Sequence, residues 1–153
     1  MAQKRKTNHS KQTGGAKLAA VAALLKKIEE KTARDVKERL GDSWRDNLFE
    51  IVMTRIDLAA PHKKTFAAMP AAFRRDPQAV PAFARTFWQT MSRILKLAEA
   101  PSKPHHVAAF GVLYVSIIDT FIKDPTRDHA KTMAALDKRL GLFEQVVEFS
   151  RCR

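Results

Sequence analysis

Cysteine is almost missing from this 153-residue chain: Cys152, next to the C-terminus, is the only one. A lone cysteine cannot form an internal disulfide, and no His or Cys stands at the spacing of a zinc site. We therefore expect a chain that works in a reducing cytoplasm and binds no metal.

Glycine is also scarce, with five residues, and the seven prolines stand mostly at segment edges, which leaves room for long helices. β-Branched residues do not alternate with polar ones, so no sheet is expected. No apolar run is long enough to span a bilayer, and the basic segment 1–10 is not followed by the apolar core of a signal peptide. These absences predict a cytoplasmic all-α protein.

The chain lacks the converging acids, bases and nucleophiles that an enzyme needs. Gly14-Gly15 is not followed by the Lys-Ser/Thr of a phosphate-binding loop. His105 and His106 are neighbours, so on a helix they point about 100° apart and cannot share a metal ion. We expect both histidines at the surface of a first helical turn, and neither catalysis nor a cofactor.

Acidic residues are outnumbered, because 28 Lys and Arg stand against 16 Asp and Glu, for a formal net charge of +12. This balance favours polyanions such as nucleic acid or an anionic membrane surface, although a soluble chain with a basic arm explains it equally well. The first fifteen residues contain no aromatic side chain that could stack on single strands. The candidate anion contacts are Lys4, Arg5, Lys6, Lys11 and Lys17.

What the chain does contain is apolar residues at the three- and four-residue spacing of helix faces. The pattern predicts a disordered basic arm over 1–15, one helix over 16–41 and a helical domain over 42–153. Helix starts are expected at Asp42 or Ser43, at Ser102, and at the Asp-Pro pairs 76–77 and 124–125, while Pro70 should kink or split its helix. Short connections marked by proline predict an antiparallel bundle of about six helices.

The most apolar segment, His105–Phe121, predicts a helix that is apolar nearly all round and therefore buried in a core or against a second chain. Asp119 is unusual there, because a buried carboxylate costs free energy unless it is paired or lies at the wet end of the helix. Alternatively, it is a polar anchor in an apolar pocket. The candidate pocket residues are Phe87, Trp88, Met91, Phe110, Tyr114 and Asp119, although aromatic and Met residues at this spacing are usually core.

Two stretches, LFEIVMTRIDLAAPHKKTFAAM (48–69) and TMAALDKRLGLFEQ (132–145), resemble regulators of the tetracycline-repressor (TetR) family. The first has the LF start, the M-x-R-x-D core and the P-H turn that are common after the DNA-binding head, and the second resembles the amphipathic last helix. The resemblance implies a ligand-binding domain that forms a homodimer, because the last two helices of each copy make an intermolecular four-helix bundle. The interface residues are then Ile117, Phe121, Met133, Leu136, Leu140, Phe143 and Val147.

The helix-turn-helix head of this family is not recognisable, since residues 16–41 form one continuous helical pattern. Either the head has degenerated into this helix, or it lies upstream of Met1, or the protein acts without reading DNA. We expect a TetR-like regulator domain that senses a small apolar molecule and dimerises. The alternatives are a TetR-like lipid- or isoprenoid-binding accessory protein of ubiquinone synthesis, and a nonspecific nucleic-acid binder that uses the basic arm.

Overall fold

The computed structural model describes the backbone of residues 3–152 and the side chains of residues 15–152. Every regular element within these ranges is a helix, which confirms the predicted all-α bundle. The elements are α1 (Gln3–Val36), α2 (Trp44–Ala59), α3 (Lys63–Ala67), α4 (Met69–Arg75), α5 (Val80–Leu97), α6 (Pro104–Lys123) and α7 (Ala130–Arg151), with 3₁₀ turns at Ala60–His62 and Pro77–Ala79.

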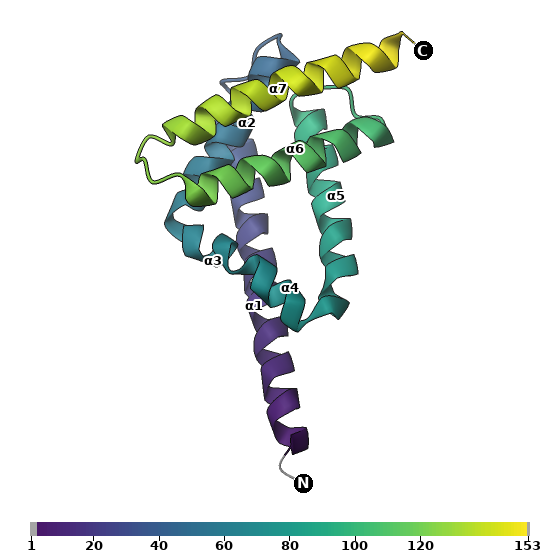
Figure 1. Cartoon of the computed structure of the whole chain (residues 1–153). Coiled ribbons are helices and arrows are strands. Elements are labelled where there is room, and N and C mark those ends of the chain that lie inside the picture. The colour runs from purple at the N-terminus through teal and green to yellow at the C-terminus, as the bar shows by residue number, and fades with distance from the viewer. Residues whose placement is uncertain (1–2, 153) are drawn as a thin grey trace.

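The two C-terminal helices form a layer on one side of the molecule. In Figure 1, α6 and α7 run antiparallel across the upper part, in front of α2 and the end of α1. Below this layer α1 and α5 extend downward, and the short helices α3 and α4 lead from α2 past α1 to the lower end of α5. α6 packs against both α5 and α7, so it occupies the centre of the arrangement.

The core forms where the inner faces of α2, α5, α6 and α7 meet. Phe143 of α7 is fully buried, and its ring centroid lies 5.6 Å from that of Phe110 and 5.8 Å from that of Trp44. Ile117 and Phe121 of α6 are buried in the same cluster. The predicted burial of the central helix is therefore confirmed for its inner face.

The first helix is longer than its sequence pattern indicated. α1 begins at Gln3, so a helical backbone runs through most of the segment for which we predicted disorder. This segment has no proline and is rich in Lys, Arg and Gln, which favour helix, while Gly14 and Gly15 each cost about 1 kcal/mol relative to Ala. The side chains of Lys4, Arg5, Lys6 and Lys11 lie outside the described residues, and Lys17 is exposed.

Local signals placed some helix boundaries correctly. The Ser43 Oγ accepts a hydrogen bond from the Asp46 N–H at 3.3 Å and caps α2, as predicted. The predicted split near Pro70 is confirmed, because α3 ends at Ala67 and α4 begins at Met69. Ser102 is not a cap: α6 is preceded by Lys103, and no side chain bonds to its first turn.

The Asp124-Pro125 pair does not start the last helix, which begins at Ala130. Instead, both carboxylate oxygens of Asp124 bind nearby threonines. Oδ1 accepts from the Thr126 N–H at 3.0 Å and from its hydroxyl at 2.6 Å, while Oδ2 accepts from the Thr132 N–H and hydroxyl, both at 2.8 Å. Asp124 thus satisfies a free N–H in the first turn of α7 and fixes the α6–α7 connection.

These hydrogen bonds hold the pKa of Asp124 well below the usual 3.8, and the bond from the Thr126 hydroxyl has the largest effect. A carboxylate whose pKa is lowered in the folded state stabilises the fold at pH values above its unfolded pKa, and this stabilisation is lost as the pH falls through the folded pKa.

We expect Asp124→Asn to be less stable than the wild type at pH 7, because its amide N–H₂ faces a donor. The measurement is urea unfolding at pH 7 and pH 3, where the difference between the two proteins should shrink; parallel pH dependences would contradict the assignment.

One helix meets the length and composition test for a membrane span. α6 has 20 residues and passes it, contrary to our expectation that no apolar run is long enough. The core helix of a soluble protein passes the same test, and the inner face of α6 packs in the core described above. α6 is therefore only weak support for a membrane span.

Candidate ligand-binding site

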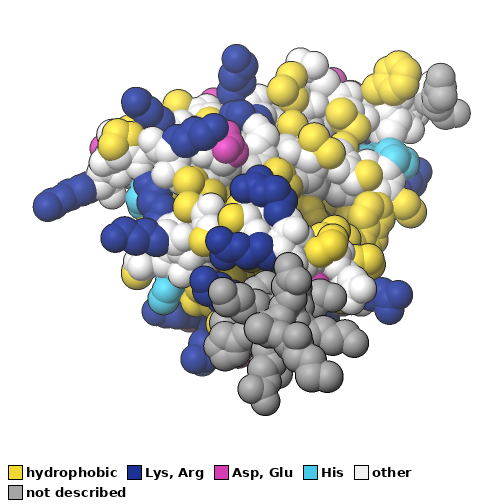
Figure 2. All heavy atoms as spheres, turned by 60° about the horizontal axis from the view of Figure 1, so that its bottom comes forward, with side chains coloured by type: hydrophobic (Ala, Val, Ile, Leu, Met, Phe, Trp, Pro, Cys, Tyr) yellow, Lys and Arg dark blue, Asp and Glu magenta, His cyan; other side chains and the backbone are white. Residues whose placement is uncertain are grey.

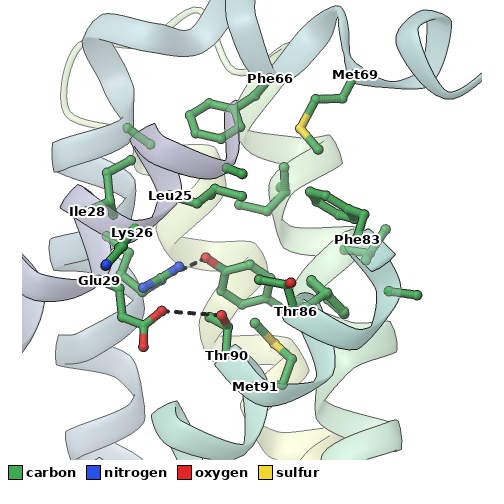
Figure 3. Close-up of a pocket in the computed structure, with 18 of the residues that line it drawn as sticks. Leu25, Lys26, Ile28, Glu29, Phe66, Met69, Phe83, Thr86, Thr90 and Met91 are labelled. Carbon is green, nitrogen blue, oxygen red and sulfur yellow. Dashed lines mark hydrogen bonds between the residues drawn. The ribbon is translucent and has the colours of Figure 1, made fainter. Parts of the chain in front are cut away.

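A cavity of about 700 Å³ is lined by residues of the six helices α1 to α6. Figure 3 shows Leu25 and Ile28 of α1 on one side of it, with Phe66 near Leu25 and with Met69 and Phe83 on the other side. Most of the lining side chains are apolar, and the volume falls within the roughly 300–1,000 Å³ of ordinary ligand pockets. The arrangement suits a small molecule with a largely apolar body.

The local sequence explains how these side chains reach the cavity. The break between α3 and α4 turns Phe66 and Met69 toward α5, and Phe83 and Phe87 are one helical turn apart on α5. Gly111 lets α6 approach α5 closely, since a Cβ at this position would lie 3.3 Å from the Phe87 Cε1. One wall of the cavity therefore depends on this missing side chain.

Few polar groups face the cavity. The Arg55 Nε donates a hydrogen bond to the Tyr114 Oη at 3.0 Å, and Arg55 is only 4% exposed. Nearer the solvent, Glu29 accepts from the Thr90 hydroxyl at 3.3 Å, a bond that a dashed line marks in Figure 3, and pairs with Arg93 at 2.8 Å. The inner cavity thus offers one cation and one phenol, whereas the rim contains charges of both signs.

Comparison with protein-family models, curated proteins and solved structures finds no match.

Four of the six predicted pocket residues line this cavity: Phe87, Met91, Tyr114 and Asp119. Phe110 does not, because it is fully buried in the core against Phe143. Trp88 is 45% exposed and lines a separate shallow hollow between α5 and α6.

Asp119 lies at the rim and is not the polar anchor of the pocket. Its carboxylate pairs with Lys123 one turn later, with Oδ2 and Nζ 2.8 Å apart, and its side chain is 62% exposed. The alternative interpretation, an ion pair near the wet end of the helix, describes it correctly.

Arg55 is the pocket residue that we did not single out from the sequence. It lies four residues after Ile51 and three after Val52, on the buried face of α2, where a charge is unexpected. A charged residue on an otherwise apolar helix face is the signal by which the sequence alone marks Arg55.

Six of the seven predicted interface residues are buried inside the single chain, each 2% exposed or less, so the chain's own core covers them: Ile117, Phe121, Leu136, Leu140, Phe143 and Val147. Five exposed apolar side chains of α6 and α7 are here named the α6–α7 face: Val112, Val115, Leu142, Val146 and Phe149. Met133 of α7 is also 42% exposed, but it lies about 180° around the helix from Leu142 and is outside this face.

His106 is not at the surface, contrary to expectation, whereas His105 is exposed. The His106 Nε2 lies 2.8 Å from the Ser150 Oγ, which ties the start of α6 to the end of α7. Burial, and then the charges of His105, Lys103 and Arg151, lower the pKa of His106. In the part of the chain that the structure describes, no three His, Cys, Asp or Glu side chains are placed to hold a metal ion.

Proposed function

We propose that this protein is a TetR-like ligand-sensing protein that binds a small, mostly apolar molecule and forms a homodimer. The observation that carries the proposal is the cavity of about 700 Å³ with its apolar lining. Lining residues such as Ala84 and Thr86 are exposed, so the cavity opens to solvent, as ligand-binding clefts do. A cleft of this size, lined mostly by apolar side chains of six helices, suits a small apolar molecule.

The α6–α7 face supports the dimer. Its five apolar side chains lie on two antiparallel helices that pack side by side. Figure 2, in which the lower side of Figure 1 comes forward, shows apolar side chains at the surface among many Lys and Arg residues. Two copies related by a twofold axis could cover this face by forming the four-helix bundle that the TetR resemblance implies.

α6 connects the cavity with this face. Tyr114 and Ile118 line the cavity, Val112 lies on the α6–α7 face, and Val115 belongs to both. A ligand that displaces α6 would therefore change the geometry of the dimer, which is the physical requirement for a sensor.

The second candidate is a lipid- or isoprenoid-binding accessory protein that does not read DNA. It is favoured by α1, which is one continuous helix of 34 residues at the place where the TetR resemblance would put a helix-turn-helix. Identification of the bound molecule separates the candidates, since a co-purified polyisoprenoid or long-chain lipid favours the accessory role.

The binding proposal can be tested with a variant that narrows the mouth of the cavity. Ala84 of α5 lines the cavity and is exposed, so Ala84→Trp can place an indole in the opening without overpacking the core. We expect solvent extraction and mass spectrometry to find an apolar compound with the wild type and much less of it with Ala84→Trp.

The matched control is Ala82→Trp, on the same helix, exposed and outside the cavity lining. It should retain the compound at the wild-type level. Failure to recover any apolar compound, together with no thermal stabilisation by added apolar molecules, would argue against a ligand-binding function.

A further inference from the structure

Arg55 is a buried cation without an acidic partner among the described side chains. It is 4% exposed, and none of the ion pairs of the described residues includes it. Its only hydrogen bond within this part of the chain joins Nε to the Tyr114 Oη, and its guanidinium carbon lies 5.9 Å from the Tyr114 ring centroid. The two terminal nitrogens of Arg55 thus keep their hydrogen-bonding capacity.

A guanidinium stays charged at any physiological pH, so burial without a counter-ion costs free energy. None of the three carboxylates that line the cavity pairs with Arg55: Glu29 pairs with Arg93, Asp119 pairs with Lys123, and Glu30 is exposed to solvent. Among the described residues, the buried side-chain nitrogens that have no hydrogen-bond partner and no solvent contact do not include the terminal nitrogens of Arg55. Arg55 lines the cavity. These nitrogens are accessible from the cavity, where an anion can reach them.

Tyr114 adds a second group at the same point. Its oxygen accepts from Arg55, which leaves the phenolic O–H free to donate. A carboxylate placed here would receive two guanidinium N–H bonds in the planar geometry that Arg favours, and one O–H bond. Beyond this pair, the inner lining is apolar: Ile28, Ala59, Phe66 and Met91 are all buried.

We propose that the ligand is a carboxylic acid with an apolar tail, whose carboxylate binds Arg55 and Tyr114 while the tail fills the apolar cavity. This inference rests on the proposed ligand-binding function and names the chemical class of the ligand. The carboxylate neutralises the buried cation, so the bound acid supplies the counter-ion that the described chain lacks.

The test uses isothermal titration calorimetry to compare three probes with the same tail: decanoate, decanol and decylamine. Each probe is kept below the concentration at which it forms micelles or separates from solution. Charge-assisted hydrogen bonds to a buried carboxylate are each strong, so decanoate should bind the wild type about 10- to 100-fold more tightly than decanol. Decylamine should bind most weakly. This comparison needs no variant.

The variant Arg55→Met then tests whether Arg55 causes the preference for decanoate over decanol. Methionine fills a similar volume, and removing an uncompensated buried charge does not destabilise a core, so the variant should fold. It should bind decanoate about 10- to 100-fold more weakly and bind decanol unchanged. Tyr114→Phe should weaken decanoate less, and Arg85→Met, an exposed arginine of α5 outside the cavity, should have no effect.

Equal affinity of the wild type for decanoate and decanol would overturn the inference and leave the apolar pocket intact. Equal weakening by Arg55→Met and Arg85→Met would also overturn it, because it would place decanoate on the basic surface. If none of the three probes binds, the proposed function itself fails.

Discussion

Replacing Phe143 with alanine is expected to lower the free energy of unfolding by about 3–5 kcal/mol. Phe143 is fully buried at the meeting point of three helices, with ring centroids 5.6 Å from Phe110, 5.8 Å from Trp44 and 6.4 Å from His106. The truncation removes these contacts and leaves a cavity that rigid helices fill only in part. For a chain of this size the midpoint of thermal unfolding should fall by roughly 6–20 °C.

Calorimetry or urea unfolding measures this loss, with Met133→Ala as the control. Met133 is also on α7 but is 42% exposed and points away from the α6–α7 face, so its truncation should cost much less. If the Phe143→Ala protein kept its stability but became monomeric, Phe143 would contact a second copy, as the resemblance in the sequence implies.

Leu142→Glu is expected to convert the proposed dimer to a monomer. Leu142 lies on the α6–α7 face, and in the proposed four-helix bundle a glutamate there would bury an unpaired carboxylate in each copy. The substitution lowers the net positive charge, so dissociation could not be attributed to greater overall repulsion between copies. Light scattering after size exclusion measures the mass, and circular dichroism checks that the helix content is kept.

The matched control is Ala134→Glu. Ala134 is exposed on the same helix, about 80° around it from Leu142, so the same charge is added beside the proposed interface rather than within it. The control should remain dimeric. A wild type that is monomeric at high concentration would remove the dimer from the proposed function, while the cavity would be unaffected.

Helix class, capping and burial could be predicted from the sequence because each depends on local spacing. The period of apolar residues indicated the buried face of α6, and Ser43 and Pro70 marked boundaries through their own backbone chemistry. The role of Asp124 could not be predicted in this way. Its carboxylate can cap the residues that follow it or bind Thr132 eight residues away, and the tertiary fold determines which of the two occurs.

The identity of the covering surface could not be predicted. An apolar stripe indicates that a face is buried but does not indicate what buries it, so Leu136, Leu140 and Phe143 were assigned to a second chain although α2 and α6 cover them. Arg55 was missed for the opposite reason, since burial of a charge contradicts the ordinary hydropathy pattern and becomes evident only from the structure.

The single long α1 has a mechanical consequence. Leu18 and Val21 are buried, so α1 is packed as far as Leu18, and about 22 Å of helix extends from there to Gln3. A tilt of about 10° at Leu18 would carry the far end through roughly 4 Å, because a continuous helix moves as a stiff rod. A shift of α1 around a bound molecule would thus also move the end of the protein where positive charge is densest.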